Sequence, residues 1–485
     1  MKKEKIIQCV SIYPRLSKTQ FKIVDTLSFL SKNMFNVGLY NVRQYFNIIQ
    51  QNEVEIQNYR PDITKNLVVL TSSYLPYSRK KEHPFKEICN YNSSTPNENY
   101  GLLHSHAAQQ TLKSVEEGYK SFFKLLVMRS KGEYDKPVHP PRYLKKNGRY
   151  KVDFPKASLS FKGNKVTLGM STKFRKLNGY TGKELTFTIP SSVKAHQIRE
   201  ITLLPIHNGR CYKILFSYEV KNLPVVNLDN TKHMSLDLGV NNFATIVNQV
   251  TGTTTILDGK YLKSINQWYN KENARLQSIK DKQGITGITK RQHQMLIKRE
   301  NKIDEAMNRF VNQVINYALE HKIGNITCLR WDGIKNKRKA RKKDNQNFVQ
   351  IPFDNFRQKL KGKCKLYSIK YHGDESEAYT SQTDALAFDK IGRQPYGKTR
   401  RIERGLYKSI TGHVINADVN GSLNQLRKVA GDDPVKDIIS RGLFNLPRRV
   451  RLAYEPATLF KKLQPVVNIK CSTLCCNPPS LGGGY

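Results

Sequence analysis

The segment HMSLDLGVNNFATIVNQ, residues 233–249, holds a single carboxylate, Asp237, inside an apolar run that is typical of a buried strand. Removing an unpaired carboxylate from water costs more free energy than the packing of its side chain returns. We therefore expect Asp237 either to cap a turn beside Gly239 or to bind a positively charged group. The segments that follow indicate which.

The pattern from residue 230 onward is strand, strand, strand, helices, strand, strand, helix. Turn residues at Asn241-Asn242 and Thr251-Gly252 separate the strands MSLDLG, FATIVN and TTTILDG, and residues 263–322 are predicted to be helical apart from a break at Gly284 to Gly287. Apolar side chains spaced 4, 3, 4 and 3 apart mark the buried face of the last helix: Ile303, Met307, Phe310, Val314 and Tyr317. The strands NITCLRW and CKLYSIKY and the helix of INADVNGSLNQLRKV complete the pattern. Antiparallel strands followed by strands reached through helical crossovers indicate an RNase H-like fold.

The first half of the chain has a different pattern. Residues up to 130 are predicted to be helical, with one apolar face at Leu27, Leu30 and Met34 and another at Leu112 and Val115. Pro140 and Pro141 end the helical pattern, and period-two alternation in CYKILFSYEV, after a hairpin signal at Asn208-Gly209, predicts a small β-barrel over residues 131–225. The fold class is therefore α+β with several domains.

Charge is the strongest compositional signal. The 485 residues include 82 Lys and Arg against 39 Asp and Glu, a formal net charge of +43. Such an excess repels itself unless a polyanion neutralises it, so nucleic acid is the expected partner. The chain has no apolar stretch of membrane-spanning length and no apolar secretory segment at its start, and its eight cysteines are scattered. These features predict a soluble, cytoplasmic protein with no membrane partner. They do not indicate any particular oligomeric state.

Six segments in order resemble the transposon-encoded TnpB proteins, which are relatives of the type V CRISPR effector nucleases. They are LHSHAAQQTLKSVEEGYKSFF, SLDLGVNNFATI, ALEHKIGNI, NQNFVQIPF, SEAYTSQT and INADVNGSLNQLRK. One such segment would be weak evidence, but six in the same order form a specific pattern. The resemblance runs from about residue 8 to about residue 430 and implies an RNA-guided DNA endonuclease with guide RNA and target DNA as partners.

The resemblance also implies a domain organisation: a helical recognition domain, a wedge β-barrel and a RuvC nuclease domain of RNase H-like fold. The expected boundaries are 1–15 for the first part of the wedge barrel, 16–130 for the recognition domain, 131–228 for the wedge barrel, 229–383 for the RuvC-like domain, 384–411 for a basic insertion in the target-strand-loading region, 412–430 for the RuvC closing helix and 431–485 for a basic C-terminal tail without a core pattern.

Three carboxylates are the expected catalytic and metal-binding residues: Asp237, Glu377 and Asp418. Phosphodiester hydrolysis in this fold uses two divalent ions about 4 Å apart, and clustered carboxylates hold them. Oxygen-only ligands favour Mg²⁺ or Mn²⁺ over zinc. Asp418 matches the family's third carboxylate, although an aspartate at a helix start is also a favoured N-cap.

The second carboxylate departs from the commonest family pattern, in which a Glu ends the fourth strand. That place holds ITCLRWDGIKN, which has no Glu, whereas DESEAYTS offers Glu377 just before the Tyr-Thr-Ser. Some TnpB relatives carry the glutamate there. Glu377 is the predicted ligand and Asp332 the reserve, and a solvated acidic loop is the alternative for residues 374–377.

A second departure concerns zinc. The family usually inserts a four-cysteine ribbon before the last Asp, whereas residues 384–417 contain no cysteine, so we expect no structural zinc. The tail cysteines Cys471, Cys475 and Cys476 lack a convincingly spaced fourth ligand. Basic residues of this insertion and of the run KNKRKARKK are the predicted nucleic-acid-binding residues: Lys337, Arg338, Lys339, Arg341, Lys342, Lys398, Arg400, Arg401 and Arg404.

The sequence leaves two other functions open. An RNA-guided DNA-binding protein that has lost cleavage and acts by occupancy would keep the charge but not a working carboxylate set. A transposase that joins DNA ends through the same fold would need an end-binding module, and no segment resembles one. The guide RNA, the flanking motif and the cleavage pattern are not encoded in any pattern found in this sequence.

Overall fold

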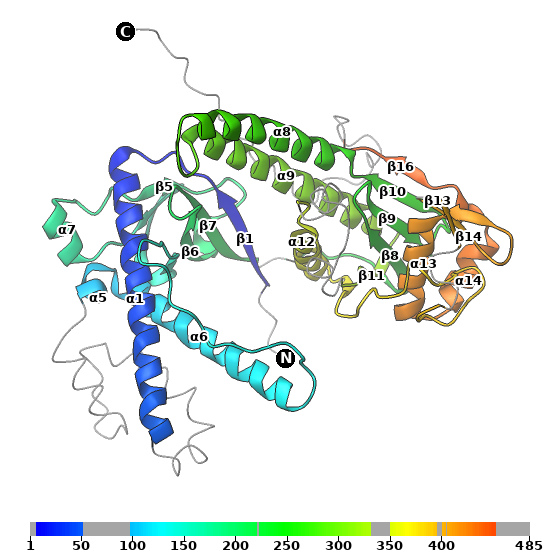
Figure 1. The fold of residues 1–485 in the computed structure, drawn as a ribbon, viewed down its shortest axis with the longest axis horizontal. Coiled ribbons are helices and arrows are strands. Elements are labelled where there is room, and N and C mark those ends of the chain that lie inside the picture. Colours follow the sequence, from blue (N-terminus) through cyan, green and yellow to red (C-terminus); the bar gives the residue numbers. More distant parts are fainter. Residues whose placement is uncertain are drawn as a thin grey trace, which may run out of the picture. The chain divides into compact units, whose positions relative to one another are not determined.

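The structure is a computed structural model that describes residues 6–51, 98–220, 223–330, 350–394, 400–403 and 405–452. The chain divides into two compact units, of which the first contains the described residues up to 220 and the second those from 223 onward (Figure 1). Among the described helices, none is both long enough and apolar enough to cross a membrane.

The first unit contains two long helices, α1 (Lys18–Gln51) and α6 (Ser105–Ser130), with the short α5 (Glu98–Leu102) before α6. The apolar faces predicted for both helices are buried: Leu27, Met34 and Val115 are at most 1% exposed. The Ser31 and Thr111 hydroxyls lie 3.0 Å apart across the contact between α1 and α6. The sequence prediction of helices in this region is confirmed for the described residues.

The strands of the first unit form two sheets. The larger has the order β1-β7-β6-β2, from β1 (Ile6–Ile12), β7 (Cys211–Val220), β6 (Ile198–Ile206) and β2 (Val152–Pro155), and all its pairs are antiparallel. The smaller joins β3 (Leu159–Lys162), β4 (Lys165–Leu168) and β5 (Thr186–Thr188), and α7 (Thr172–Asn178) lies between β4 and β5 in the chain.

A β-rich region is thus present where the sequence predicted one. The predicted β6–β7 hairpin turns through Asn208 and Gly209, which both have positive φ. Strand pairing among the described residues does not close the two sheets into a barrel, because β1 and β2 are the edges of the larger sheet. A closed wedge barrel is therefore not seen.

The second unit is built on one mixed sheet in the order β12-β11-β8-β9-β10-β16. Its centre is the predicted meander of β8 (Asp229–Leu238), β9 (Asn242–Asn248) and β10 (Thr254–Asp258), in which neighbours are antiparallel. On one side, β11 (Ile323–Thr327) pairs parallel with β8 and β12 (Lys370–His372) pairs parallel with β11. On the other side, β16 (Arg448–Val450) pairs parallel with β10.

Helices cover both faces of this sheet (Figure 1). The long α9 (Lys290–Glu320) and α12 (Phe353–Leu366) bury Phe310 and Phe356 against Phe243 of β9, with ring centroids 4.1 and 5.0 Å from that ring. The opposite face carries α13 (Ala417–Ala430), and α14 (Asp433–Ser440) follows it. The predicted break in the helical region is confirmed, since α8 (Lys260–Lys282) ends before Gly284 and Thr289 caps α9 through a capping box.

The sequence pattern predicted one strand for the segment CKLYSIKY, and this prediction is wrong. Cys364 is buried in the last turn of α12, and the helix ends where Ser368 takes a positive φ and the Ile369 amide donates to the Cys364 carbonyl at 2.9 Å. This is a Schellman-type helix end. Only Lys370–His372 forms a strand, β12.

The prediction of a tail without a core pattern from residue 431 is wrong for its first part. Val435 and Ile438 of α14 are fully buried, Phe444 is 6% exposed, and β16 extends the sheet beyond β10. The apolar side chains are few and widely spaced, which is why no period was visible. Cys471, Cys475 and Cys476 lie outside the described residues.

A third small sheet joins β13 (Arg401–Glu403), β14 (Leu406–Lys408) and β15 (Val414–Asn416) just before α13.

Candidate nuclease site

The two faces of β8 explain why a carboxylate stands in an apolar strand. Met234, Leu236 and Leu238 point to the core formed with α9 and α12, whereas the alternate residues face α13. The Ser235 hydroxyl donates to the Ser422 carbonyl of α13 at 2.8 Å. Asp237, two residues further along the same face, therefore lies at the sheet–helix boundary rather than in the apolar core.

Asp418 stands in the first turn of α13 but does not cap it. The side chain of Asn416 is the N-cap and accepts from the amides of Asp418 and Val419 at 2.9 and 3.4 Å. The N-cap alternative for Asp418 is therefore wrong. Its carboxylate instead accepts from the side-chain amide of Asn242, at the start of β9, at 2.7 Å.

Glu377 is held at the end of the parallel strands. Beyond β11, the Arg330 amide donates to the Glu375 carbonyl at 2.8 Å, the Glu377 amide donates to the Arg330 carbonyl at 3.0 Å, and Arg330 and Ser376 form a parallel bridge. The segment thus continues the sheet pairing past β12. Glu375 is exposed and Glu377 is half-buried, so the segment is not simply a solvated acidic loop.

The three predicted carboxylates are brought into one electrostatic environment. Burial raises the pKa of Asp237 well above its ordinary value, and the negative charges of Glu377 and Asp418 raise it further. The Arg401 guanidinium and a hydrogen bond from the Gln425 amide, 2.8 Å from Oδ1, oppose that rise. Strand β8, the segment after β12 that pairs with Arg330, and helix α13 therefore bring mutually repelling carboxylates into one environment, an arrangement that a cation would stabilise.

The chemistry of this donor set fits Mg²⁺ or Mn²⁺, because it offers oxygen ligands and an excess of negative charge. As the side chains stand, no group of three or more His, Cys, Asp and Glu residues within the described ranges is close enough together to hold a metal ion. Asp332, the reserve ligand, lies outside the described residues.

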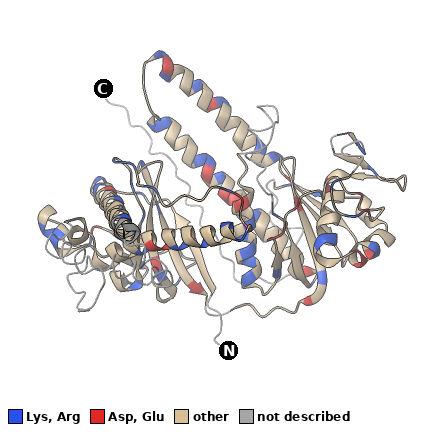
Figure 2. Ribbon diagram, turned by 60° about the horizontal axis from the view of Figure 1, so that its bottom comes forward, with Lys and Arg blue, Asp and Glu red and all other residues tan. Residues whose placement is uncertain are grey.

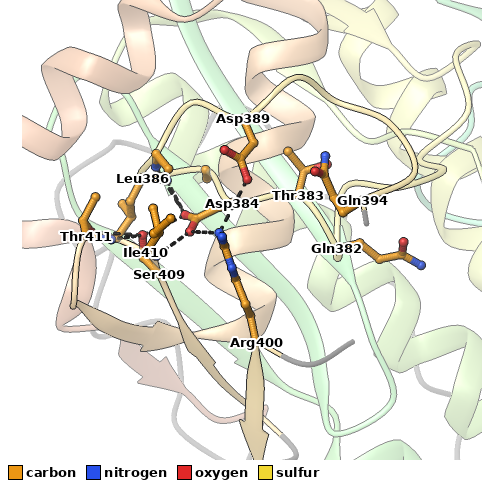
Figure 3. Close-up of polar contacts among 12 residues, drawn as sticks. Gln382, Thr383, Asp384, Leu386, Asp389, Gln394, Arg400, Ser409, Ile410 and Thr411 are labelled. Carbon is orange, nitrogen blue, oxygen red and sulfur yellow. Dashed lines mark hydrogen bonds and ion pairs between the residues drawn. The ribbon is translucent and has the colours of Figure 1, made fainter. Parts of the chain in front are cut away.

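Arg400 has a different environment from the one predicted (Figure 3). Its guanidinium lies 2.9 Å from the fully buried Asp384 carboxylate and 3.5 Å from that of Asp389. Asp384 also accepts from the amide of Ile410 at 2.9 Å and from the hydroxyl of Ser409 at 2.9 Å. Arg400 thus holds the insertion together through these ion pairs, and its role in binding nucleic acid stays a prediction.

The other predicted nucleic-acid-binding residues divide into two groups. Arg401 is exposed on β13 and its charge acts on Asp237, so it lies close to the candidate site. The remainder lie outside the described residues: Lys337, Arg338, Lys339, Arg341, Lys342, Lys398 and Arg404. Elsewhere, Lys and Arg are spread over the helices of both units (Figure 2).

Sequence reasoning missed the polar residues that surround the carboxylates. Asn242 and Gln425 bind Asp418 and Asp237 directly, and the Lys428 ammonium donates to the carbonyls on both sides of Glu377. A Cβ atom on Gly421 would lie 2.7 Å from Oδ2 of Asp237, so only glycine fits there without displacement. For those on α13 the available signal was the spacing, since residues 418, 421, 425 and 428 share a helix face, whereas Asn242 on β9 gave no such signal.

Two comparisons with known proteins bear on this site. The family OrfB_IS605, described as "Probable transposase", matches residues 216–330, which include β8 and Asp237. The "TnpB-like protein ORF457" of Acidianus two-tailed virus is 24% identical over 347 residues, which cover 67% of this chain and 73% of that protein.

The chain is thus similar to a TnpB-like protein over 67% of its length. Among solved structures, the chain is similar to the protein in the Cas12f1–sgRNA–target DNA complex, with a TM-score of 0.33 and 13% identity over 86% of this chain and 98% of that one. It is also similar to the protein in the Cas12i1 R-loop complex after target DNA cleavage, with a TM-score of 0.33 and 9% identity over 86% and 69% of the two chains.

Proposed function

We propose that this chain is an RNA-guided DNA endonuclease whose second unit is a RuvC-type domain of RNase H-like fold. The observation that carries the proposal is that α13 bears Asp418, contacts Asp237 through Gln425, and contacts the backbone on both sides of Glu377 through Lys428. The raised pKa of Asp237 beside Glu377 and Asp418 supports it. Similarity to a TnpB-like protein supports it, and so does the sheet order, in which an antiparallel meander is continued by two parallel strands on the β8 side. The net charge of +43 supports a long nucleic acid as partner.

Asp237, Glu377 and Asp418 would hold Mg²⁺ or Mn²⁺. The bound ions would activate water and stabilise the leaving oxygen of the phosphodiester. The chain itself orients the ligands: Asn242 fixes one oxygen of Asp418, Gln425 fixes one oxygen of Asp237, and sheet pairing through Arg330 fixes the backbone of Glu377. Specificity for sequence would come from pairing between guide RNA and target strand, with protein contacts to the backbone.

The decisive experiment uses the full chain with RNA transcribed from its own locus and a matching DNA target. Asp237→Asn, Asp418→Asn and Glu377→Gln should abolish cleavage and leave guided DNA binding intact, because each removes a ligand charge while keeping the side-chain shape. Glu375→Gln is the matched control, since that side chain is exposed and two residues away.

Three outcomes would contradict parts of the proposal. Loss of cleavage in Asp332→Asn together with full activity in Glu377→Gln would assign the second ligand to the fourth-strand position. Guided binding without cleavage in either Mg²⁺ or Mn²⁺ would establish the occupancy function instead. One tightly held zinc per chain in elemental analysis would contradict the prediction that the cysteine-free insertion needs none.

A further inference from the structure

One face of α13 contacts each segment that carries a candidate carboxylate. Asp418, Gly421, Gln425 and Lys428 are spaced 3, 4 and 3 residues apart, so they follow one another along the helix surface. We call these four residues the aligning face. The first provides a carboxylate itself, and the next two contact Asp237.

Gln425 connects Asp237 to the end of β11. It is fully buried, its Nε2 donates to Oδ1 of Asp237 at 2.8 Å, and its Oε1 accepts from the Leu329 amide at 3.2 Å. The two contacts require opposite ends of the side-chain amide, because the carboxylate only accepts and the backbone N–H only donates. The orientation of Gln425 is thereby determined, and Asp237 is fixed relative to the strand that leads to the Glu377 segment.

Lys428 holds the backbone on both sides of Glu377. Its ammonium donates to the carbonyls of Ser376 and Ala378, at 2.8 Å in each case. The carbonyl of Glu377 accepts from the amide and hydroxyl of Thr380 at 3.2 and 2.9 Å. All three consecutive carbonyls are therefore hydrogen-bonded, and the two bonds from Lys428 carry a charge, which makes them stronger than bonds between neutral groups.

Gly421 allows α13 to approach β8 this closely. A Cβ atom at this position would lie only 2.7 Å from the Asp237 carboxylate, so any side chain here would push the carboxylate or the helix away. The close approach places Gln425 within reach of Asp237 and Lys428 within reach of the Glu377 segment. One rigid helix thus determines the relative positions of residues that are far apart in the sequence.

We propose that Gln425 and Lys428 are positioning residues, which hold Asp237 and the Glu377 segment in register with Asp418 so that the three carboxylates can close on divalent ions. The inference rests on the proposed function, because a shared ion is the reason for aligning these groups. It adds two residues that contact neither the substrate nor the ions, and whose effect is transmitted through the carboxylates.

The test measures Mn²⁺ binding to the full chain by electron paramagnetic resonance, without substrate, alongside guided DNA cleavage. Lys428→Met and Gln425→Met should each weaken Mn²⁺ affinity by roughly 10- to 100-fold, which is the usual effect of removing a group that orients a ligand. Lys436→Met, an exposed lysine on α14, should leave affinity unchanged. Guided DNA binding should be unchanged in all three variants.

A double-mutant comparison separates an effect of Lys428 through Glu377 from a general disturbance of the structure. Since Lys428 acts through Glu377, Lys428→Met should add no further loss of Mn²⁺ affinity in a Glu377→Gln background. Lys428→Arg, which keeps the charge and the donors, should restore most of the affinity. Should Lys428→Met fail to fold in a thermal unfolding control, the same comparison is made with Lys428→Gln, which keeps a donor but not the charge.

The outcomes distinguish this inference from the proposed function. Wild-type protein that binds no Mn²⁺ and cuts no guided target contradicts the proposed function and removes the basis for positioning. Wild-type protein that does both, with Lys428→Met and Gln425→Met indistinguishable from it, overturns the positioning role alone. Independent losses in the Glu377→Gln and Lys428→Met backgrounds also overturn it, because they show that Lys428 does not act through Glu377.

Discussion

Asp384→Asn should loosen the insertion between the Tyr-Thr-Ser segment and α13. The two oxygens of Asp384 accept five hydrogen bonds, three from the amides of Leu386, Ala387 and Ile410, one from Ser409 and one from Arg400. An asparagine keeps the shape but turns one oxygen into an NH₂ group that faces donors. If Oδ2 is replaced, the bonds from Arg400 and Ile410 are lost.

The magnitude follows from these contacts. Removing one partner of a buried ion pair costs about 3–5 kcal/mol. The Arg400 side chain is only 20% exposed, so this range applies, but Arg400 retains a second partner, Asp389, at 3.5 Å. We therefore expect the lower end, about 3 kcal/mol, for opening of the loop. Hydrogen exchange at the Leu386, Ala387 and Ile410 amides should then accelerate on the order of 100-fold, since about 1.4 kcal/mol corresponds to a factor of ten.

Asp389→Asn is the matched control, because it removes the other partner of the same guanidinium. Its side chain is 28% exposed and its contact is longer, so the expected cost is below about 1 kcal/mol. Equal acceleration of exchange in the two variants would refute the reasoning, since it would mean that burial and the five bonds of Asp384 do not determine the stability of the loop.

Asp237→Asn should raise the stability of the metal-free protein at neutral pH, because the raised pKa of Asp237 means that its stabilising, protonated form is lost as pH rises. In EDTA, the urea midpoint of the variant should converge with that of the wild type as pH falls through the raised pKa. Gly421→Ala should change the unfolding midpoint little, because about 1 kcal/mol of helix propensity offsets the close contact, yet it should weaken Mn²⁺ binding by displacing Asp237. Arg401→Met removes a charge that lowers the pKa of Asp237, so the acidic limb of the cleavage pH profile should move to higher pH, and an unchanged limb would exclude that interaction. Asn416→Ala should cost about 1 kcal/mol in thermal unfolding through the lost helix cap, with no cost if Asp418 takes over as cap.

The sequence predicted the meander, the two long helices of the second unit and the helix that opens near Asp418, because strong periods and turn residues mark them. It offered Asp418 as a possible N-cap and missed Asn416, because Asn and Asp cap helices about equally well and nothing in the sequence fixes which of the two begins the helix. CKLYSIKY carries apolar residues compatible with a helix end or a strand, and only packing on the core selects the helix for its first part.

The candidate site was predictable only in part. Asp237 and Asp418 could be found from the residues and the family pattern, and Glu377 only from the family pattern. The contacts that orient them come from residues with no distinctive signal, such as Lys428, whose partners are backbone carbonyls 52 and 50 residues away. The ion pair of Arg400 could not be predicted, because its buried partner Asp384, 16 residues earlier, could not be distinguished from a solvated acid in the sequence.

The placement of α13 has a consequence for the order in which the protein matures on the ribosome. Gln425 lies 188 residues after Asp237, and Thr254 of β10 bonds to the Phe444 carbonyl 190 residues later. At about 5–20 residues per second, translation needs on the order of ten seconds or more to cover that span. Until α13 and the residues after it have emerged, Asp237 lacks its contact with Gln425 and Thr254 lacks its contact with Phe444. The side of the sheet that carries the candidate carboxylates is therefore completed late in synthesis.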